Sequence, residues 1–160
     1  MHVRRGMPHF MDDYARSMRF SLSWADNRFP DFARWRAEAR ATALACLDYD
    51  PPAVPFDVAV LSDEDRGDYR QRKITFAASP WYRVPAYLLT PRGDGPFPAV
   101  LALHDHGAFF LYGKEKLVRT EADANPGLAH FKATYYGGRS VAEELVRRGY
   151  VVLCADMLFW

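Results

Sequence analysis

The sequence predicts an α/β fold in which antiparallel strands come before a parallel β-α-β unit, with a helical leader in front of both. Three observations support this. Apolar residues recur at helical spacing within residues 29–47, alternate with a period of two within 56–88, and form uninterrupted runs at 99–103 and 151–155. Alternation is typical of half-exposed strands, and uninterrupted short apolar runs are typical of strands covered on both faces.

The helical leader is expected over residues 1–53, and we expect it to pack on a sheet formed by residues 54–160. Asp31 can cap a helix, because its side chain can accept from the first backbone amides. The apolar stripe of this helix follows at Phe32, Trp35, Ala39, Ala43 and Leu47. A weaker helical pattern covers Phe10 to Ser21. Consecutive prolines at 51 and 52 end the region, since they remove backbone donors.

The strands of residues 54–160 follow from turn signals between apolar segments. Ala78-Ser79-Pro80 and the run Pro91–Pro96 separate alternating segments. Between the two uninterrupted apolar runs, Ser140 and Glu143 have the spacing of a capping box, and Gly149 can end the helix that they begin. A helix at this place is what a crossover between parallel strands requires.

Composition excludes several kinds of partner. The 160 residues carry 21 basic and 20 acidic side chains, which gives no field to attract nucleic acid or an anionic membrane. No apolar stretch approaches the ~18 residues of a membrane span. We therefore expect a cytoplasmic protein with a small-molecule partner. Cys46 and Cys154 are too few for a disulfide framework and are expected to be reduced core thiols.

The most informative motif is His104-Asp105-His106-Gly107-Ala108-Phe109-Phe110, directly after the first parallel strand. Glycine allows a tight turn there, so the amides that follow can point at a developing oxyanion. Two other interpretations stay open. The motif can be only a strand-ending turn, or His104 and His106 can ligate a metal, although a third and fourth ligand are not obvious.

Three further features have more than one interpretation. The aromatic-rich loop at 108–139 can face a substrate or fill the side of a core. Ser140 lies in a Gly-x-Ser sequence, but a turn precedes it instead of a strand, which favours a helix cap over a nucleophile. Asp156 ends a strand, where an acid can take part in catalysis but more often holds loops through backbone amides.

Taken together, the runs 103–116, 135–150 and 151–156 resemble the dienelactone hydrolase-like and acetyl-esterase-like branch of the α/β-hydrolase superfamily. The resemblance covers residues 54–160 and implies the amino-terminal part of a serine hydrolase that acts on carboxylic esters or lactones without a cofactor or metal. It implies oxyanion-hole amides at Ala108 and Phe109 and a structural acid at Asp156. The residues then expected against substrate are His106, Gly107, Phe110 and Tyr112.

In that family the nucleophile, acid and base follow in the order Ser, Asp or Glu, His, and this sequence holds no serine placed to act as the first. We therefore expect these residues to form an incomplete core that is inactive alone. An unpaired edge is expected at Tyr150–Ala155, available to the remaining segment of the hydrolase or to self-association. The alternative functions are a non-catalytic module that binds a ligand or partner beside His106 and Phe109, and a metal-dependent hydrolase that uses His104 and His106.

Overall fold

A computed structural model describes residues 9–26, 28–47, 50–158 and 160. The chain divides into two compact units, residues 1–50 and 51–160. Among the described helices, none combines the length and apolar character that a membrane crossing requires.

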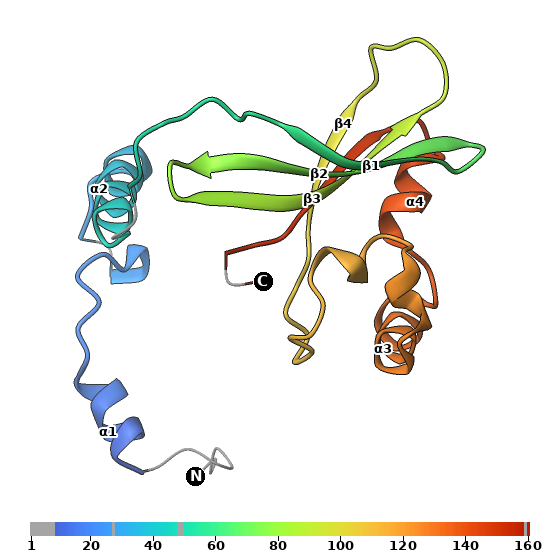
Figure 1. The fold of residues 1–160 in the computed structure, drawn as a ribbon. Coiled ribbons are helices and arrows are strands. Elements are labelled where there is room, and N and C mark those ends of the chain that lie inside the picture. The colour runs from blue at the N-terminus through green and yellow to red at the C-terminus, as the bar shows by residue number, and fades with distance from the viewer. Residues whose placement is uncertain (1–8, 27, 48–49, 159) are drawn as a thin grey trace. The chain divides into compact units, whose positions relative to one another are not determined.

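The first unit contains the helices α1 (His9–Ser17) and α2 (Phe32–Ala45), drawn in blue and cyan in Figure 1. Asp31 caps α2 by accepting from the Arg34 amide at 2.8 Å, as expected. Phe32 packs its ring against Trp24 and Trp35, at centroid distances of 5.5 and 5.1 Å. The helix expected to reach Ser21 ends at Ser17, and no side chain of α2 is buried. Packing of this leader on the sheet stays a prediction.

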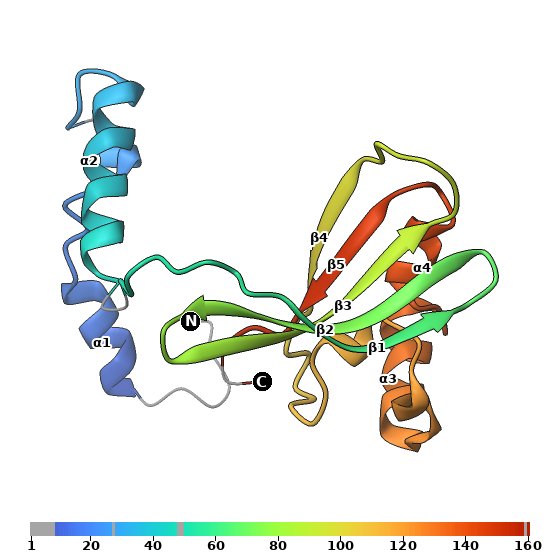
Figure 2. The ribbon, with the colours of Figure 1, turned by 45° about the horizontal axis from the view of Figure 1, so that its top comes forward.

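The second unit is built on a mixed sheet of five described strands in the order β1-β2-β3-β5-β4 (Figure 2). The first three strands pair antiparallel in sequence order, β5 then pairs antiparallel with β3, and β4 pairs parallel with β5. This confirms the predicted α/β class with antiparallel strands before a parallel pair. The strand bounds are β1 Ala59–Asp65, β2 Tyr69–Ser79, β3 Tyr82–Pro91, β4 Ala99–Leu103 and β5 Val151–Ala155.

The position of the two parallel strands corrects one expectation. Leu153 of β5 pairs with Leu88 on one side and Leu101 on the other, so β5 lies inside the sheet. The unpaired edge predicted at Tyr150–Ala155 is wrong, and the edge strands of the described sheet are β1 and β4. Leu101 is 60% exposed and Leu103 is 61% exposed, so β4 is not covered on both faces either. An apolar run identifies a parallel strand, but it does not say which of two parallel strands lies inside.

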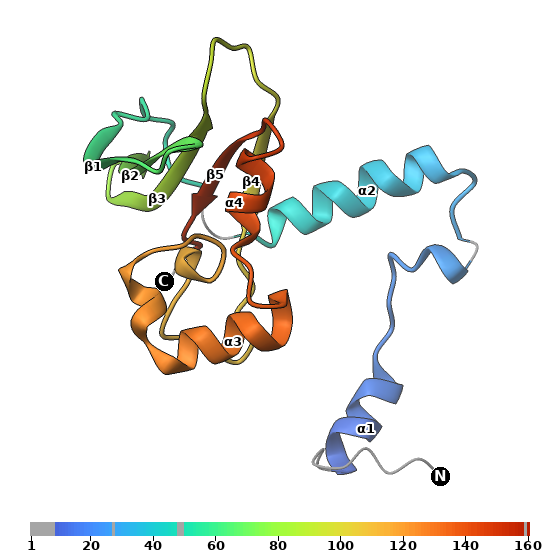
Figure 3. The ribbon, with the colours of Figure 1, turned by 90° about the vertical axis from the view of Figure 1, so that its right-hand side faces the viewer.

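The main core lies between the sheet and the helix α4 (Val141–Val146), which Figure 3 shows beside β5. Ala142 and Val146 of α4 pack in one cluster with Leu89 of β3 and Val152 of β5. A smaller cluster contains Ile74 of β2, Val84 and Ala86 of β3, and Ala155 of β5. The apolar residues of the strands therefore contribute to two separate hydrophobic clusters, and the larger cluster packs α4 against the sheet.

The segment between β4 and α4 contains a helix that the periodicity does not reveal, α3 (Pro126–Tyr136). Asn125 caps it by accepting from the amides of Gly127 and Leu128 at 2.9 and 3.3 Å. Pro126 occupies its first turn, and Gly137 ends it with a φ of +61°. These are ordinary start and stop signals, so Asn125-Pro126 and Gly137 could have indicated the helix.

The capping box predicted at Ser140 and Glu143 is wrong. Ser140 occupies the N-cap position of α4, but its side chain makes no capping hydrogen bond. Glu143 is 2% exposed, and its carboxylate lies 3.4 Å from Nε of Arg119 instead of turning back to the cap. A capping box does occur upstream, where Thr120 and the third residue after it bond reciprocally.

Candidate functional site

The turn after β4 is the feature around which the candidate site is built. Gly107 and Ala108 both have left-handed backbone conformations, with φ of +48° and +54°. A Cβ added to Gly107 would lie 2.5 Å from Phe131 and 2.6 Å from Asp105, so only glycine fits. The amide of Phe109 closes the turn by donating to the carbonyl oxygen of His106 at 2.8 Å. The turn is therefore tight, as the sequence predicts, and strained at its centre.

Both amides expected to serve an oxyanion have partners inside this turn. Ala108 donates its amide to Nδ1 of His106 at 3.0 Å, and the Phe109 amide is used in closing the turn. The partner of Ala108 is an exposed side chain that can rotate away, whereas the partner of Phe109 is part of the turn itself. The oxyanion role of Ala108 and Phe109 stays a prediction. It requires rotation of the His106 side chain for Ala108 and opening of the turn for Phe109.

The residues expected against substrate fall into two groups. His106 stacks on Phe110 with a centroid distance of 5.4 Å and an angle of 8° between the rings, and Phe110 is 68% exposed. Tyr112 instead contacts the ring of Phe109 at 5.9 Å, and that ring stacks on Phe131 at 5.7 Å. The aromatic residues of the loop therefore divide between the two interpretations, because one group faces solvent and the other fills the side of the core.

His104 is buried at 3% exposure behind the turn, and both of its ring nitrogens are engaged. Nε2 accepts from the amide of Met157 at 3.3 Å, so the proton lies on Nδ1, which points at the carbonyl oxygen of Asp105 at 3.2 Å. A metal at His104 would have to displace one of these bonds. The described residues contain no group of three or more His, Cys, Asp or Glu side chains that could hold a metal ion.

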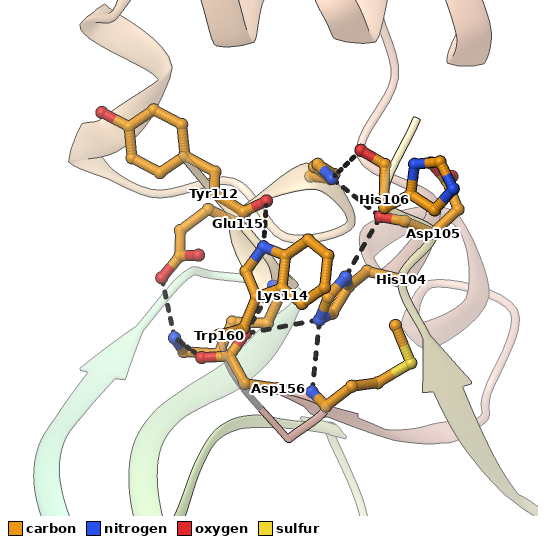
Figure 4. Close-up of polar contacts among 10 residues, drawn as sticks. His104, Asp105, His106, Tyr112, Lys114, Glu115, Asp156 and Trp160 are labelled. Carbon is orange, nitrogen blue, oxygen red and sulfur yellow. Dashed lines mark hydrogen bonds and ion pairs between the residues drawn. The ribbon is translucent and has the colours of Figure 1, made fainter. Parts of the chain in front are cut away.

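Asp156 lies at the centre of a buried ionic cluster next to His104 (Figure 4). Its carboxylate accepts from the Lys114 amide at 2.8 Å and from Lys114 Nζ at 2.5 Å, and Nζ also pairs with Glu115 at 2.9 Å. Oδ1 of Asp156 lies 3.7 Å from Nε2 of His104. This contact set holds the loop after β4 to the end of β5.

The charges of this cluster stabilise each other. Burial disfavours the charged forms of Lys114 and Glu115, but the hydrogen bonds that Lys114 donates to Asp156 and Glu115 raise the pKa of Lys114, and the ammonium of Lys114 lowers the pKa of Glu115. Gly113 makes the close approach possible, since a Cβ there would lie 2.7 Å from Trp160 and 2.9 Å from His104. Sequence reasoning assigned no role to Gly113, Lys114 or Glu115, although they stand in the run that carries the family resemblance.

Comparison with known proteins gives a consistent relationship. No protein-family model matches the chain. YtaP of Bacillus subtilis (strain 168), named as a candidate hydrolase, is 30% identical over 122 residues, which are 76% of this chain and 37% of that protein. A crystal structure of a candidate acetyl xylan esterase from Bacteroides fragilis NCTC 9343 superposes with a TM-score of 0.60 and 19% identity, covering 92% of this chain and 36% of that one.

The chain is similar in sequence to a candidate hydrolase and has the fold of a candidate acetyl xylan esterase. The sequence match carries the relationship to a hydrolase, and the structural match shows the shared fold. The chain spans little more than a third of the length of either protein, 37% and 36%. The comparisons thus confirm the predicted fold and a similarity to a hydrolase.

Proposed function

We propose that these residues form the amino-terminal, oxyanion-loop part of a serine hydrolase that acts on carboxylic esters or lactones without a cofactor. The observation that carries this proposal is the left-handed turn at Gly107 and Ala108, directly after β4 of the parallel pair. Parallel sheets place their active sites just beyond the carboxyl ends of their strands. Asp156, at the end of neighbouring β5, binds the loop that follows this turn.

In this proposal the turn stabilises negative charge, and His106 and Phe110 line the approach to it. An ester carbonyl under attack develops an oxyanion, and backbone amides aimed at that oxygen lower the barrier. The open edge of β4 then offers a pairing site for the rest of the hydrolase.

The nucleophile and its base are proposed to come from residues outside this sequence. Ser140 is 6% exposed, and its Oγ lies 3.4 Å from Nζ of Lys132. That ammonium also pairs with Asp123 at 2.5 Å, so it is a charged donor and cannot take a proton from serine. None of the serines lies in a Gly-x-Ser-x-Gly sequence. An oxyanion loop without nucleophile and base is expected to leave the chain inactive alone.

Turnover of a short-chain aryl ester by the 160-residue chain tests this assignment, together with labelling by a fluorophosphonate. We expect no turnover above the buffer rate and no labelled serine. Ser140→Ala is the matched control, because it removes the one serine that the sequence places near a helix start. Turnover or labelling that disappears in Ser140→Ala would contradict the proposal.

One observation favours a second function, a non-catalytic module that binds a ligand beside His106 and Phe109. Both Ala108 and Phe109 already donate their amides to His106, which is the arrangement of a closed turn. Saturable binding of a neutral ester that leaves the amides of the turn unshifted, in an inert chain, would favour this module over the hydrolase part.

A further inference from the structure

Lys116 is a buried cation whose position the hydrolase chemistry does not explain. Its side chain is fully buried at 0% exposure, at the end of a short 3-10 helix, Lys114–Lys116. Nζ donates to two consecutive carbonyl oxygens, those of Asp105 at 2.7 Å and His106 at 2.9 Å. The rings of Phe131 and Trp160 lie 5.1 and 5.3 Å from the same nitrogen.

This environment differs from that of the other two buried lysines. Lys114 pairs with Asp156 and Lys132 pairs with Asp123, each at 2.5 Å. Among the described residues, Lys116 has no carboxylate within ion-pair distance. An ammonium buried without an anion is costly unless its hydrogen bonds are satisfied. The carbonyls of the turn and the two aromatic faces are what satisfy it.

The bonds to Lys116 fix the direction of the peptide groups at the start of the turn. The peptide bond between His106 and Gly107 is trans, so its N–H points opposite to its C=O. Because the His106 carbonyl points at Lys116, the Gly107 amide points away from it. No described group accepts from the Gly107 amide, whereas the amides of Ala108 and Phe109 both have acceptors.

The Asp105 side of the turn is held in a second way. Tyr136 Oη donates to Oδ2 of Asp105 at 2.6 Å, so this residue is bound through its side chain by α3 and through its carbonyl by Lys116. Lys116 therefore contacts both carbonyls at the start of the turn. The His106 carbonyl, whose direction sets that of the Gly107 amide, is held by Lys116 from outside the turn and by the Phe109 amide from within it.

We propose that Lys116 is a positioning residue that holds the Asp105 and His106 carbonyls inward, so that the Gly107 amide is presented outward as the free oxyanion donor of the turn. The role of the Gly107 amide as an oxyanion donor rests on the proposed function, whereas the contacts by which Lys116 holds the turn stand on geometry alone. It assigns the donor to Gly107 in the resting turn, one residue before the position implied by the family resemblance.

The test compares Lys116→Met with the matched control Lys132→Met in the isotopically labelled 160-residue chain. Both changes remove a buried ammonium, but only Lys116 touches the turn. The readouts are the N–H residual dipolar coupling and heteronuclear NOE of Gly107, measured against amides of β3 and β5, and the amide shift caused by methylphosphonate. A general loss of stability would also change the couplings and NOE values of the strand amides, so it can be distinguished from the expected local effect at Gly107.

In Lys116→Met we expect the Gly107 coupling to shrink toward zero, its NOE to fall, and the methylphosphonate shift to be lost. In Lys132→Met all three are expected to match the wild type. A folded Lys116→Met chain with an unchanged Gly107 coupling and NOE would overturn the inference. If the wild type shows no methylphosphonate shift but Lys116→Met still disorders Gly107, the bracing is supported and the proposed function fails.

A measurement on the wild type covers the case in which Lys116→Met does not fold. Through-hydrogen-bond couplings from Nζ of Lys116 to the carbonyl carbons of Asp105 and His106 are expected. The coupling from Nζ of Lys132 to the carbonyl carbon of Val118 is the internal control, since that bond is 2.9 Å long. Detection of the control coupling without either Lys116 coupling would overturn the inference.

Discussion

Gly113→Ala is expected to destabilise residues 51–160 strongly. Gly113 lies where the loop after β4 passes the end of β5. A Cβ at this position would fall within 3.0 Å of the carboxylate of Asp156, the ring of Trp160 and the ring of His104. Asp156 and His104 are buried and hydrogen-bonded, so neither can move without losing a partner.

The expected magnitude follows from two contributions. Overpacking a well-packed site costs about 1–3 kcal/mol. Displacing the Asp156 carboxylate weakens its hydrogen bonds from the Lys114 amide and ammonium, and a hydrogen bond to a charged group contributes about 1.5–3 kcal/mol. Together these give a loss of about 3–6 kcal/mol in the free energy of unfolding, which is a large fraction of the stability of an ordinary domain.

Equilibrium urea denaturation, followed by far-UV circular dichroism, measures this loss for Gly113→Ala. Gly127→Ala is the matched control, because its Cβ would approach other groups only to 3.1 and 3.3 Å and alanine suits its helix. The control is expected to stay within about 1 kcal/mol of the wild type. A Gly113→Ala midpoint indistinguishable from that of the control would refute the packing described for this site.

Three further predictions concern charge, thiol reactivity and the brace on the turn. The folded-state pKa of Glu115 is lowered from its ordinary value of 4.5, so the contribution of Glu115 to stability is present above that pH and is lost as the pH falls through the folded value. Glu115→Gln should therefore flatten the acid side of a curve of unfolding free energy against pH. An unchanged acid side would contradict this. Burial raises the pKa of Cys154 to about 12, whereas Cys46 is exposed. Ellman's reagent should therefore label Cys46 in the native chain and Cys154 only in denaturant. Labelling of the native chain that persists in Cys46→Ser would contradict this. Tyr136→Phe removes the 2.6 Å bond to Asp105 and should cost about 1–2 kcal/mol in urea denaturation, so a neutral effect would show that the bond does not brace the turn.

Most of the fold could be predicted because its signals are local. The alternating and uninterrupted apolar runs identify the five described strands, and both parallel strands have the bounds read from the sequence. Asp31 and Gly149 also act where their chemistry predicts, as a helix cap and as a left-handed stop. The order of the strands in the sheet has no such local signal, since it depends on how the crossover packs whether β4 or β5 lies at the edge.

The turn of the candidate site could be predicted from the sequence, but the lysine contacts that hold the turn and its loop in place could not. Gly107 is required by a backbone conformation that sequence reasoning can anticipate. Lys114 and Lys116 look like surface charges in a polar run, and only the folded chain brings one to Asp156 and the other to the carbonyls of the turn. The bond from Ala108 to His106 is likewise a choice of side-chain rotamer, which composition and spacing do not encode.

The most direct test of the central claim is a titration of the wild-type chain with methylphosphonate, a stable tetrahedral oxyanion, followed by amide proton and nitrogen shifts. The claim is that the turn after β4 presents a backbone amide to negative charge. It predicts a saturable downfield shift of the Gly107 amide, with Ala108 following as His106 rotates away and Phe109 remaining in its turn. Saturation of the chain with the probe while none of these amides moves would contradict the claim.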